Sequence, residues 1–345
     1  MYKEVWPKKD GRKLILYGYT RPVLSPVEED LSSPGAQPHL RWHPLRKEWV
    51  IYAPHRGERT FLPPKEFCPL CPSRPGSFPT EIPFHNFEIA VFENHFPSLY
   101  PAAPPPPELC LATARGQGIC EVVVYTADHV GSMGTLSPER REMLVRVWID
   151  RYQELYTHSF VRYVMPFENR GEEVGVTLHH PHGQIYAYSF LPPILAREVE
   201  AFREKAVFEE LQTCLDPYII AGNETFVAFV PPCARFPYEV WIIPWRRVPG
   251  PWEFTEPEIQ EFAKILGETV VRYDGLFNRS FPYIMVFHAA PKGEEKTFHF
   301  HVEFYPLLRA PEKLKFLAGT EQGAGVTVVD ALPEETAAQI REVKL

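Results

Sequence analysis

The chain has 345 residues, 45% of them hydrophobic and 14% aromatic, which is enough apolar material for one large or two ordinary domains. Its net charge of −8 and pI near 5.9 argue against non-specific binding to nucleic acid or to an anionic membrane surface. No apolar run approaches the roughly 18 residues of a membrane span, and the N-terminus lacks the apolar core of a signal peptide. We therefore expect a soluble, cytoplasmic protein that binds neither nucleic acid nor membrane.

Residues 1–39 form a polar, turn-rich N-terminal extension with one predicted strand over 14–19. Strands predicted over 40–45 and 48–53 lead to Arg56 and Arg59. Two arginines three positions apart after a strand suit phosphate recognition. A solvated basic loop would have the same spacing, so the pair by itself leaves both interpretations open.

Six cysteines in a chain of this length do not make a disulfide framework. Cys68 and Cys71 form a Cys-x-x-Cys motif, which is either a redox pair or half of a metal site. A redox pair normally opens a helix, and Pro69 and Pro72 disfavour one. Metal binding is the favoured interpretation, and a tetrahedral zinc ion would need two further ligands.

From residue 121 onward the order of predicted elements repeats after 118 or 119 positions. Each copy has a strand, a long amphipathic helix with a Ser or Thr N-cap, a second strand and a His-x-His strand. Such a repeat predicts two α+β halves, each with antiparallel strands and one long helix. The paired segments are 121–125 with 239–243, Ser137 with Thr255, 160–165 with 281–286, and 180–182 with 299–301.

Three histidines and a glutamine lie within residues 179–184. In an extended chain, residues two apart share a face, so His180 and His182 are expected to point the same way. Pro181 cannot donate a ladder hydrogen bond, which favours the edge or the end of a strand. A neutral imidazole can ligate a metal or, when its other nitrogen is held, act as a nucleophile.

The run His180-Pro181-His182-Gly183-Gln184 resembles the active-site motif of the galactose-1-phosphate uridylyltransferases, of the histidine-triad superfamily. This resemblance implies an α+β chain: a duplicated histidine-triad-like fold with a continuous antiparallel half-barrel sheet and flanking helices. It also implies a homodimer. The predicted parts are the extension 1–39, a first half 40–195 with the catalytic motif and zinc site, and a second half 196–345 with a second metal site and a sugar-side segment.

The same resemblance implies ping-pong transfer of UMP between UDP-glucose and galactose 1-phosphate, giving UDP-galactose and glucose 1-phosphate. His182 would carry the uridylyl group, and Gln184 would donate to the phosphoryl oxygens. Threonine 177 replaces a serine of the family, while His95, Thr320 and Thr327 stand where an aspartate, a tyrosine and a glutamine are expected. The residues implied as substrate contacts are Arg56, Arg59, Asn94, Asn169, Thr177, Lys315 and Glu321.

The resemblance further implies two structural metal sites. The zinc ligands would be Cys68, Cys71, His129 and His180. The second site, for iron or a second zinc, would use Glu198, His288, His299 and His301.

Two other functions stay open. A nucleotide-sugar phosphorylase or hydrolase of the same superfamily would use the same histidine, with phosphate or water as the acceptor. A non-catalytic nucleotide-binding module is the other, and the intact motif together with Arg56 and Arg59 disfavours it.

Overall fold

The computed structural model describes residues 1–21, 35–58, 62–76 and 78–345. Internal contacts divide the chain into two compact units. The chain leaves the first unit for the last time after Glu198, three residues beyond the predicted boundary at 195. The first unit comprises Met1–Val130, Val147–Pro166 and Thr177–Glu198, and the second comprises Gly131–Arg146, Phe167–Val176 and Val199–Leu345.

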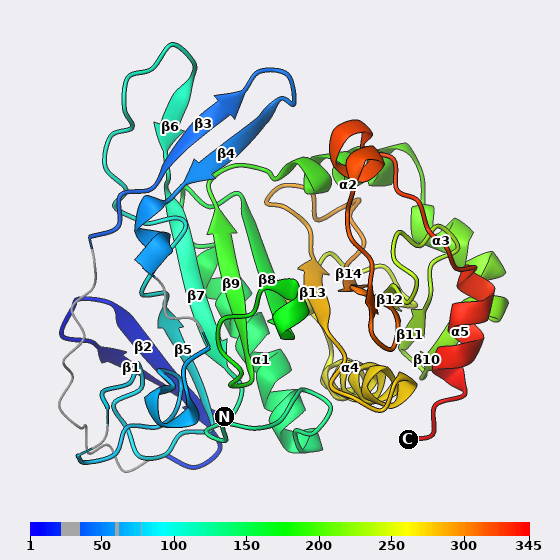
Figure 1. Cartoon of the computed structure of the whole chain (residues 1–345), viewed down its shortest axis with the longest axis horizontal. Coiled ribbons are helices and arrows are strands. Elements are labelled where there is room, and N and C mark those ends of the chain that lie inside the picture. The colour runs from blue at the N-terminus through cyan, green and yellow to red at the C-terminus, as the bar shows by residue number, and fades with distance from the viewer. Residues whose placement is uncertain (22–34, 59–61, 77) are drawn as a thin grey trace. The chain divides into compact units, whose positions relative to one another are not determined.

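The main sheet of the first unit has the strand order β1-β2-β5-β7-β9-β8 (Figure 1). A separate small sheet has the order β4-β3-β6. The strands of the main sheet are β1 (Tyr2–Pro7), β2 (Lys13–Gly18), β5 (Ile89–Glu93), β7 (Gly118–Val124), β9 (His182–Tyr188) and β8 (Tyr163–Arg170), and those of the small sheet are β3 (His39–His43), β4 (Glu48–Tyr52) and β6 (Thr113–Arg115).

The N-terminal segment forms two strands, whereas the sequence predicted one. Hairpin β1–β2 is antiparallel, and β2 pairs in turn with β5. Strand β2 is buried from Leu14 onward because both of its edges are paired, whereas β1 alternates between half-buried and exposed residues and ends at Pro7. The hairpin is therefore an integral part of the first unit.

The second unit has the strand order β8-β13-β14-β12-β11-β10, so the ladder of hydrogen-bonded strands continues through β8 to a total of eleven. This continuity agrees with the predicted sheet. The strands not yet given are β10 (Ile219–Gly222), β11 (Phe226–Phe229), β12 (Val240–Pro244), β13 (Tyr283–His288) and β14 (His301–Pro306), followed by a short pair, β15 (Leu308–Ala310) and β16 (Lys313–Leu314).

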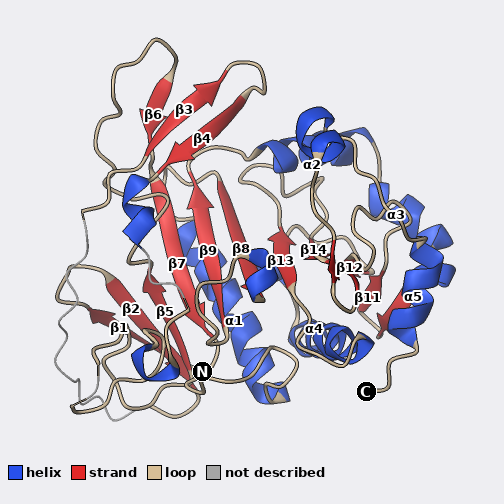
Figure 2. Cartoon of the chain, in the orientation of Figure 1, coloured by secondary structure: helices blue, strands red, loops and turns tan. Residues whose placement is uncertain are grey.

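The helices lie outside the strand ladders (Figure 2). Helix α4 begins at a capping box in which Thr255 and Glu258 satisfy each other's backbone amides, as its predicted N-cap requires. Ser137 likewise caps α1, since its Oγ accepts a hydrogen bond from the amide of Arg140 at 3.2 Å. The helices are α1 (Pro138–Leu155), α2 (Pro193–Glu204), α3 (Val207–Leu211), α4 (Glu256–Leu276) and α5 (Pro333–Arg341).

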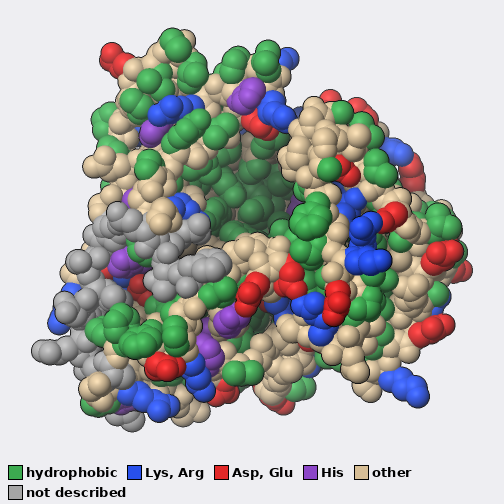
Figure 3. All heavy atoms as spheres, in the orientation of Figure 1, with side chains coloured by type: hydrophobic (Ala, Val, Ile, Leu, Met, Phe, Trp, Pro, Cys, Tyr) green, Lys and Arg blue, Asp and Glu red, His purple; other side chains and the backbone are tan. Residues whose placement is uncertain are grey.

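The order β7, α1, β8, β9 recurs as β12, α4, β13, β14, which confirms the predicted duplication. The long helix of each copy supplies buried side chains to its sheet, such as Trp148 of α1, which meets Tyr125 edge-on at 6.2 Å, and Phe262 of α4, which is fully buried. On the face drawn in Figure 3, basic and acidic side chains lie interspersed. Among the described residues, no helix combines the length and the apolar composition of a membrane span.

A buried ion pair joins α1 to the sheet of the first unit. The guanidinium of Arg151 donates to both oxygens of Glu121 on β7, at 2.9 and 2.8 Å, and both residues are at most 4% exposed. Removing one partner of such a pair leaves an uncompensated buried charge.

We therefore expect Arg151→Met to destabilise the first unit by about 3–5 kcal/mol and to lower its thermal unfolding midpoint in calorimetry. The double variant Arg151→Met/Glu121→Gln also removes the unpaired carboxylate and should recover part of the lost stability. Equal midpoints for the wild type and the single variant would contradict this assignment.

Candidate active site and metal centres

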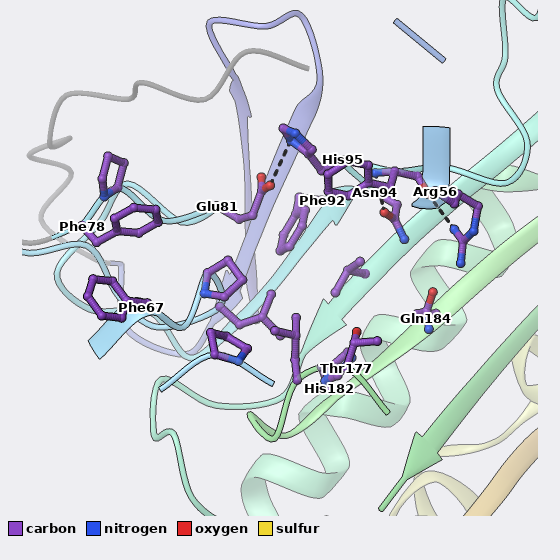
Figure 4. Close-up of a pocket in the computed structure, with 17 residues that line it drawn as sticks. Arg56, Phe67, Phe78, Glu81, Phe92, Asn94, His95, Thr177, His182 and Gln184 are labelled. Atoms are coloured by element: carbon purple, nitrogen blue, oxygen red, sulfur yellow. Dashed lines mark hydrogen bonds and ion pairs between the residues drawn. The ribbon is translucent and has the colours of Figure 1, made fainter. Parts of the chain in front are cut away.

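A cavity of about 490 Å³ lies within the first unit (Figure 4). Its walls come from the segment after β4, the cysteine loop, the end of β5 and the start of β9. Of the predicted site residues that the structure describes, five line this cavity: Arg56, Asn94, Thr177, His182 and Gln184.

His182 is the first residue of β9, and its ring is held by the chain just before it. Its Nδ1 lies 2.7 Å from the carbonyl oxygen of His180. A carbonyl only accepts, so Nδ1 carries the hydrogen and Nε2 keeps its lone pair. Burial lowers the pKa of His182, which keeps the ring neutral. The imidazole thus has the protonation state of a nucleophile.

Gln184 lies two residues along β9 from His182, and both side chains line the cavity, as expected for one face of a strand. His180 precedes the strand, and its ring belongs to a different cluster described below. Thr177 reaches the same cavity from the loop before the motif, where its carbonyl accepts the amide of Leu62 at 2.8 Å.

Arg56 lies on a 3-10 turn, Pro54–Glu58, directly after β4. Its Nη1 donates to the carbonyl of Phe96 at 2.6 Å, and the Oδ1 of Asn94 accepts the amide of Phe96 at 2.9 Å. These bonds fix a cation and an amide on the same wall of the cavity (Figure 4). The second predicted arginine, Arg59, lies outside the described residues.

The opposite end of the cavity is aromatic. Phe67 and Phe78 meet edge-on with ring centroids 5.7 Å apart, and both line the cavity. Figure 4 draws them on one side of the group, with Arg56 and Gln184 on the other. An apolar, aromatic end facing a polar, cationic end suits a ligand with a flat base and a phosphate.

Cys68, Cys71, His129 and His180 form a compact group within the first unit, with one potential ligand atom from each within 4.8 Å of the others. Cys71 Sγ lies 3.3 Å from His129 Nδ1 and 3.6 Å from His180 Nδ1, and Cys68 Sγ lies 3.9 Å from His180 Nδ1. The sulfur–nitrogen edge of a tetrahedral zinc site is about 3.6 Å. The four residues predicted as zinc ligands therefore have the spacing that zinc requires.

The hydrogen bonds and pKa values of this group also favour metal binding. The Nε2 of His180 contacts the carbonyl of Thr126 at 2.8 Å, which leaves Nδ1 to face the sulfurs. Burial lowers the pKa of His180 to about 4, so its ring is a neutral ligand. Burial, with the nearby Cys68, raises the pKa of Cys71 to about 12, and a bound cation would offset this by stabilising the thiolate. The cysteine pair sits in a loop and not at the start of a helix, which favours metal over redox chemistry.

A second group of potential metal ligands lies in the second unit. His288 and His301 stand opposite each other on β13 and β14, with ring centroids 4.8 Å apart. Glu303 Oε1 lies 3.5 Å from His301 Nε2. Burial alone would raise the pKa of Glu303, but the neighbouring His288 and His301 lower it to about 2, so the carboxylate is ionised. This group offers two nitrogen ligands and one oxygen ligand, a set that suits iron or zinc.

Glu303 takes a place in this group that the sequence analysis assigned to His299. Strand β14 begins at His301, so alternation puts 301 and 303 on one face while His299 precedes the strand. The Nε2 of His299 contacts the carbonyl of Pro244 at 3.1 Å, and its buried Nδ1 has no hydrogen-bond partner among the described residues. Glu198, the fourth predicted ligand, is the last residue of the first unit, on α2, and its role stays a prediction.

One sequence signal would have found Glu303. It stands 119 positions after Gln184, as His301 does after His182. The repeat thus aligns the ionised carboxylate of Glu303 with the side-chain amide of Gln184.

Three predicted substrate contacts lie in the second unit. Asn169 is paired with Ile284 in the β8–β13 ladder. Lys315 is buried and donates to the carbonyl of Val328, and its Nζ lies 3.6 Å from Glu321 Oε1. Glu321 also accepts the amide of Ala318 at 3.1 Å, so it orders its own segment. Their roles toward a substrate stay predictions.

Comparison with known proteins places these features in one family. Residues 28–192 match the N-terminal domain of galactose-1-phosphate uridyl transferase, and residues 208–345 match its C-terminal domain. The galactose-1-phosphate uridylyltransferase of Thermotoga maritima is 40% identical over 321 residues, covering 89% of this chain and 98% of the relative.

Solved structures agree. One titled as a uridylyltransferase superposes with a TM-score of 0.79 at 29% identity, covering 88% of this chain and 98% of the other. An ADP-glucose phosphorylase from Arabidopsis thaliana shares the fold, with a TM-score of 0.69 at 22% identity over 90% of this chain and all of the other. On the family matches and the identity to the bacterial relative, this chain belongs to the galactose-1-phosphate uridylyltransferase family.

Proposed function

We propose that this protein transfers UMP between UDP-glucose and galactose 1-phosphate through a covalent intermediate on His182. The observation that carries the proposal is the 2.7 Å contact between His182 Nδ1 and the carbonyl of His180, which leaves Nε2 as a lone-pair donor at the cavity. Family membership supplies the substrates.

The reaction has two displacement steps. The lone pair of His182 Nε2 attacks the α-phosphorus of UDP-glucose, forming an N–P bond while the P–O bond to glucose 1-phosphate breaks. A phosphate oxygen of galactose 1-phosphate then attacks the same phosphorus, which breaks the N–P bond and releases UDP-galactose. The His180 carbonyl accepts from Nδ1 throughout, and so stabilises the positive ring of the intermediate.

Two side chains would stabilise the negative charge that develops on the phosphoryl oxygens. Gln184 can donate from its amide, and Arg56 supplies a fixed cation on the same wall. Thr177, Asn94, Asn169 and Arg59 complete the proposed nucleotide and phosphate contacts.

The metals are proposed as structural. Zinc, held by Cys68, Cys71, His129 and His180, would fix the carbonyl of His180 by fixing its ring. The second group, with Glu198, His288 and His301 and with Glu303 or His299, would hold iron or a second zinc.

We also propose that the protein is a cytoplasmic homodimer in which Lys315 and Glu321 serve the sugar side of the partner's site. The segment that carries them exposes large apolar side chains, among them Phe316 at 75% and Val328 at 58%, which a second copy would cover. Glu321 could accept hydrogen bonds from hexose hydroxyls, a role that inorganic phosphate would not need.

Incubation with UDP-glucose labelled at the α-phosphate should leave acid-labile, base-stable label on His182, as a phosphoramidate requires. His182→Ala should abolish labelling while UDP still binds. His179→Ala removes an exposed histidine of the same run and should be labelled like the wild type. Label on serine or cysteine, or an active enzyme that takes up no label, would contradict the mechanism.

The labelled enzyme also separates the alternative activities. Galactose 1-phosphate should discharge the label faster than inorganic phosphate or water. If phosphate discharges it fastest and releases UDP, the protein is a phosphorylase; if water alone suffices, it is a hydrolase.

Gln184→Ala should slow uridylylation about 10²–10³-fold with little change in KM, because it removes a donor used mainly in the transition state. Single-turnover kinetics measure this directly. Tyr186→Phe, two residues further along the same strand, is the matched control and should keep the wild-type rate. An effect confined to KM would mean that Gln184 binds substrate uniformly.

Cys68→Ser should lose zinc and lower the thermal unfolding midpoint together, because a structural metal couples its binding to folding. Metal content by mass spectrometry and calorimetry give the two readouts. Cys110→Ser, which changes an exposed cysteine, should alter neither. Wild-type protein without zinc or iron would count against both metal sites.

A further inference from the structure

Two buried carboxylates of the second unit share one arginine. Glu239, just before β12, and Glu303, on β14, have side chains that are 1% and 7% exposed, whereas the side chain of Arg235 is 42% exposed. Arg235 Nη2 lies 3.1 Å from Glu303 Oε2 and 3.6 Å from Glu239 Oε1. A buried carboxylate is costly without a partner. Arg235 balances the charge of both from the surface.

The repeat explains why this cation comes from a loop. Glu239 stands 118 positions after Glu121, whose partner in the first copy is Arg151 of α1. The same offset from Arg151 leads to Thr269 of α4, which is uncharged. The long helix of the second copy therefore supplies no cation from the equivalent position, and Arg235, in the loop between β11 and β12, takes that place.

Both ends of Arg235 are held. Glu239 Oε2 accepts the backbone amides of Arg235 and Phe236 at 2.6 and 3.2 Å. Glu239 Oε1 accepts Trp241 Nε1 at 2.9 Å, which fixes the carboxylate that holds the loop. At the other end, the guanidinium carbon lies 4.9 Å from the ring centroid of Tyr305, within the range of a cation–π contact. The guanidinium therefore has a defined position against Glu303.

The two oxygens of Glu303 have different surroundings. Oε2 accepts hydrogen bonds from the Tyr305 hydroxyl and from Arg235 Nη2. Because one carboxylate oxygen has two lone pairs, these two donors occupy Oε2. Oε1 lies 3.5 Å from His301 Nε2, within the group of potential metal ligands that also contains His288. Oε1 is therefore the oxygen that Glu303 offers to an ion beside the histidines.

We propose that Arg235 and Tyr305 are positioning residues of the second metal group. By holding Oε2 of Glu303, they present Oε1 to the ion as a single-oxygen ligand, without binding the ion themselves. The inference rests on the proposed function, which assigns a metal ion to this group, and it takes Glu303 and not His299 as the ligand.

Loss of Arg235 has two opposite effects on metal binding. Removing its positive charge would strengthen the binding of a cation, whereas removing its hydrogen bond would let Glu303 turn and so weaken binding. The guanidinium is partly exposed, so water and salt screen its charge, while the hydrogen bond acts on a buried carboxylate. Loss of such an outer hydrogen bond weakens metal binding about 10–100-fold. We therefore expect weaker binding.

The test measures retention of zinc by the full chain. Zinc-loaded protein is dialysed against chelator buffers that set a series of free zinc concentrations, and the zinc left per chain is measured by mass spectrometry. His288→Ala removes a ligand of the second group and so identifies the step in the curve that belongs to this group. Arg235→Met and Tyr305→Phe should lose this zinc at a free zinc concentration about 10–100-fold higher than the wild type does. The step that belongs to the Cys68 group should not move.

Two further variants serve as controls. Arg235→Lys keeps the charge and a donor, and should recover most of the affinity for zinc. Arg279→Met is the matched control, because the side chain of Arg279 is 39% exposed and pairs with Glu173 in the same unit, outside the metal group. Its zinc curve should coincide with that of the wild type. Tyr305→Phe keeps the ring beneath Arg235 and removes only the hydroxyl, so it tests the hydrogen bond with the least change in packing.

A wild-type zinc curve for Arg235→Met or for Tyr305→Phe overturns the positioning role of that residue. A lower thermal unfolding midpoint with an unchanged zinc curve overturns it too, because the residue then stabilises the fold without placing Glu303. If the wild type lacks the step that His288→Ala should remove, the metal assignment and this inference fall together. Uridylyl transfer through His182 is assayed separately, so its failure would leave the zinc measurements valid.

Discussion

One hydrogen bond organises the active site: the 2.7 Å contact between His182 Nδ1 and the carbonyl of His180. It decides which nitrogen of His182 is available for chemistry. The same residue, His180, turns its ring to Cys68 and Cys71 and anchors its Nε2 on the carbonyl of Thr126. The backbone of His180 thus orients the proposed nucleophile, while its side chain belongs to the candidate metal group. Any disturbance of that group would move the acceptor on which His182 depends.

The sequence predicts the parts of this arrangement that depend on local pattern. The His-x-His-x-Gln alternation, the N-caps at Ser137 and Thr255, and the repeat after 118 or 119 residues are periodic features, and the structure contains them all. The four residues predicted to hold zinc lie far apart in the chain, and their grouping was supplied by the family resemblance. The structure brings all four together.

What the sequence could not predict depends on where distant segments meet. Strand β1 has three strong strand formers, Tyr2, Val5 and Trp6, but they do not alternate regularly with polar residues, and it pairs because β2 offers it an edge. Lys8 and Arg12 look like ordinary surface cations until the fold places Glu81 between them. Glu303 was missed for another reason. No characteristic sequence spacing marks a carboxylate that lies beside two histidines. Only an alignment of the two copies of the repeat, in which Glu303 matches Gln184, indicates its position.

The duplication extends to single hydrogen bonds. His301 Nδ1 contacts the carbonyl of His299 at 2.9 Å, as His182 Nδ1 contacts that of His180 at 2.7 Å, so the second copy keeps the same backbone contact to its imidazole. What differs is the neighbour two residues on, where Gln184 is replaced by the ionised Glu303. A carboxylate there repels phosphoryl oxygens and attracts cations. The carboxamide at 184 can donate to a phosphoryl oxygen, whereas the carboxylate at the equivalent position 303 can only accept, so the two copies offer opposite polarity beside the same imidazole.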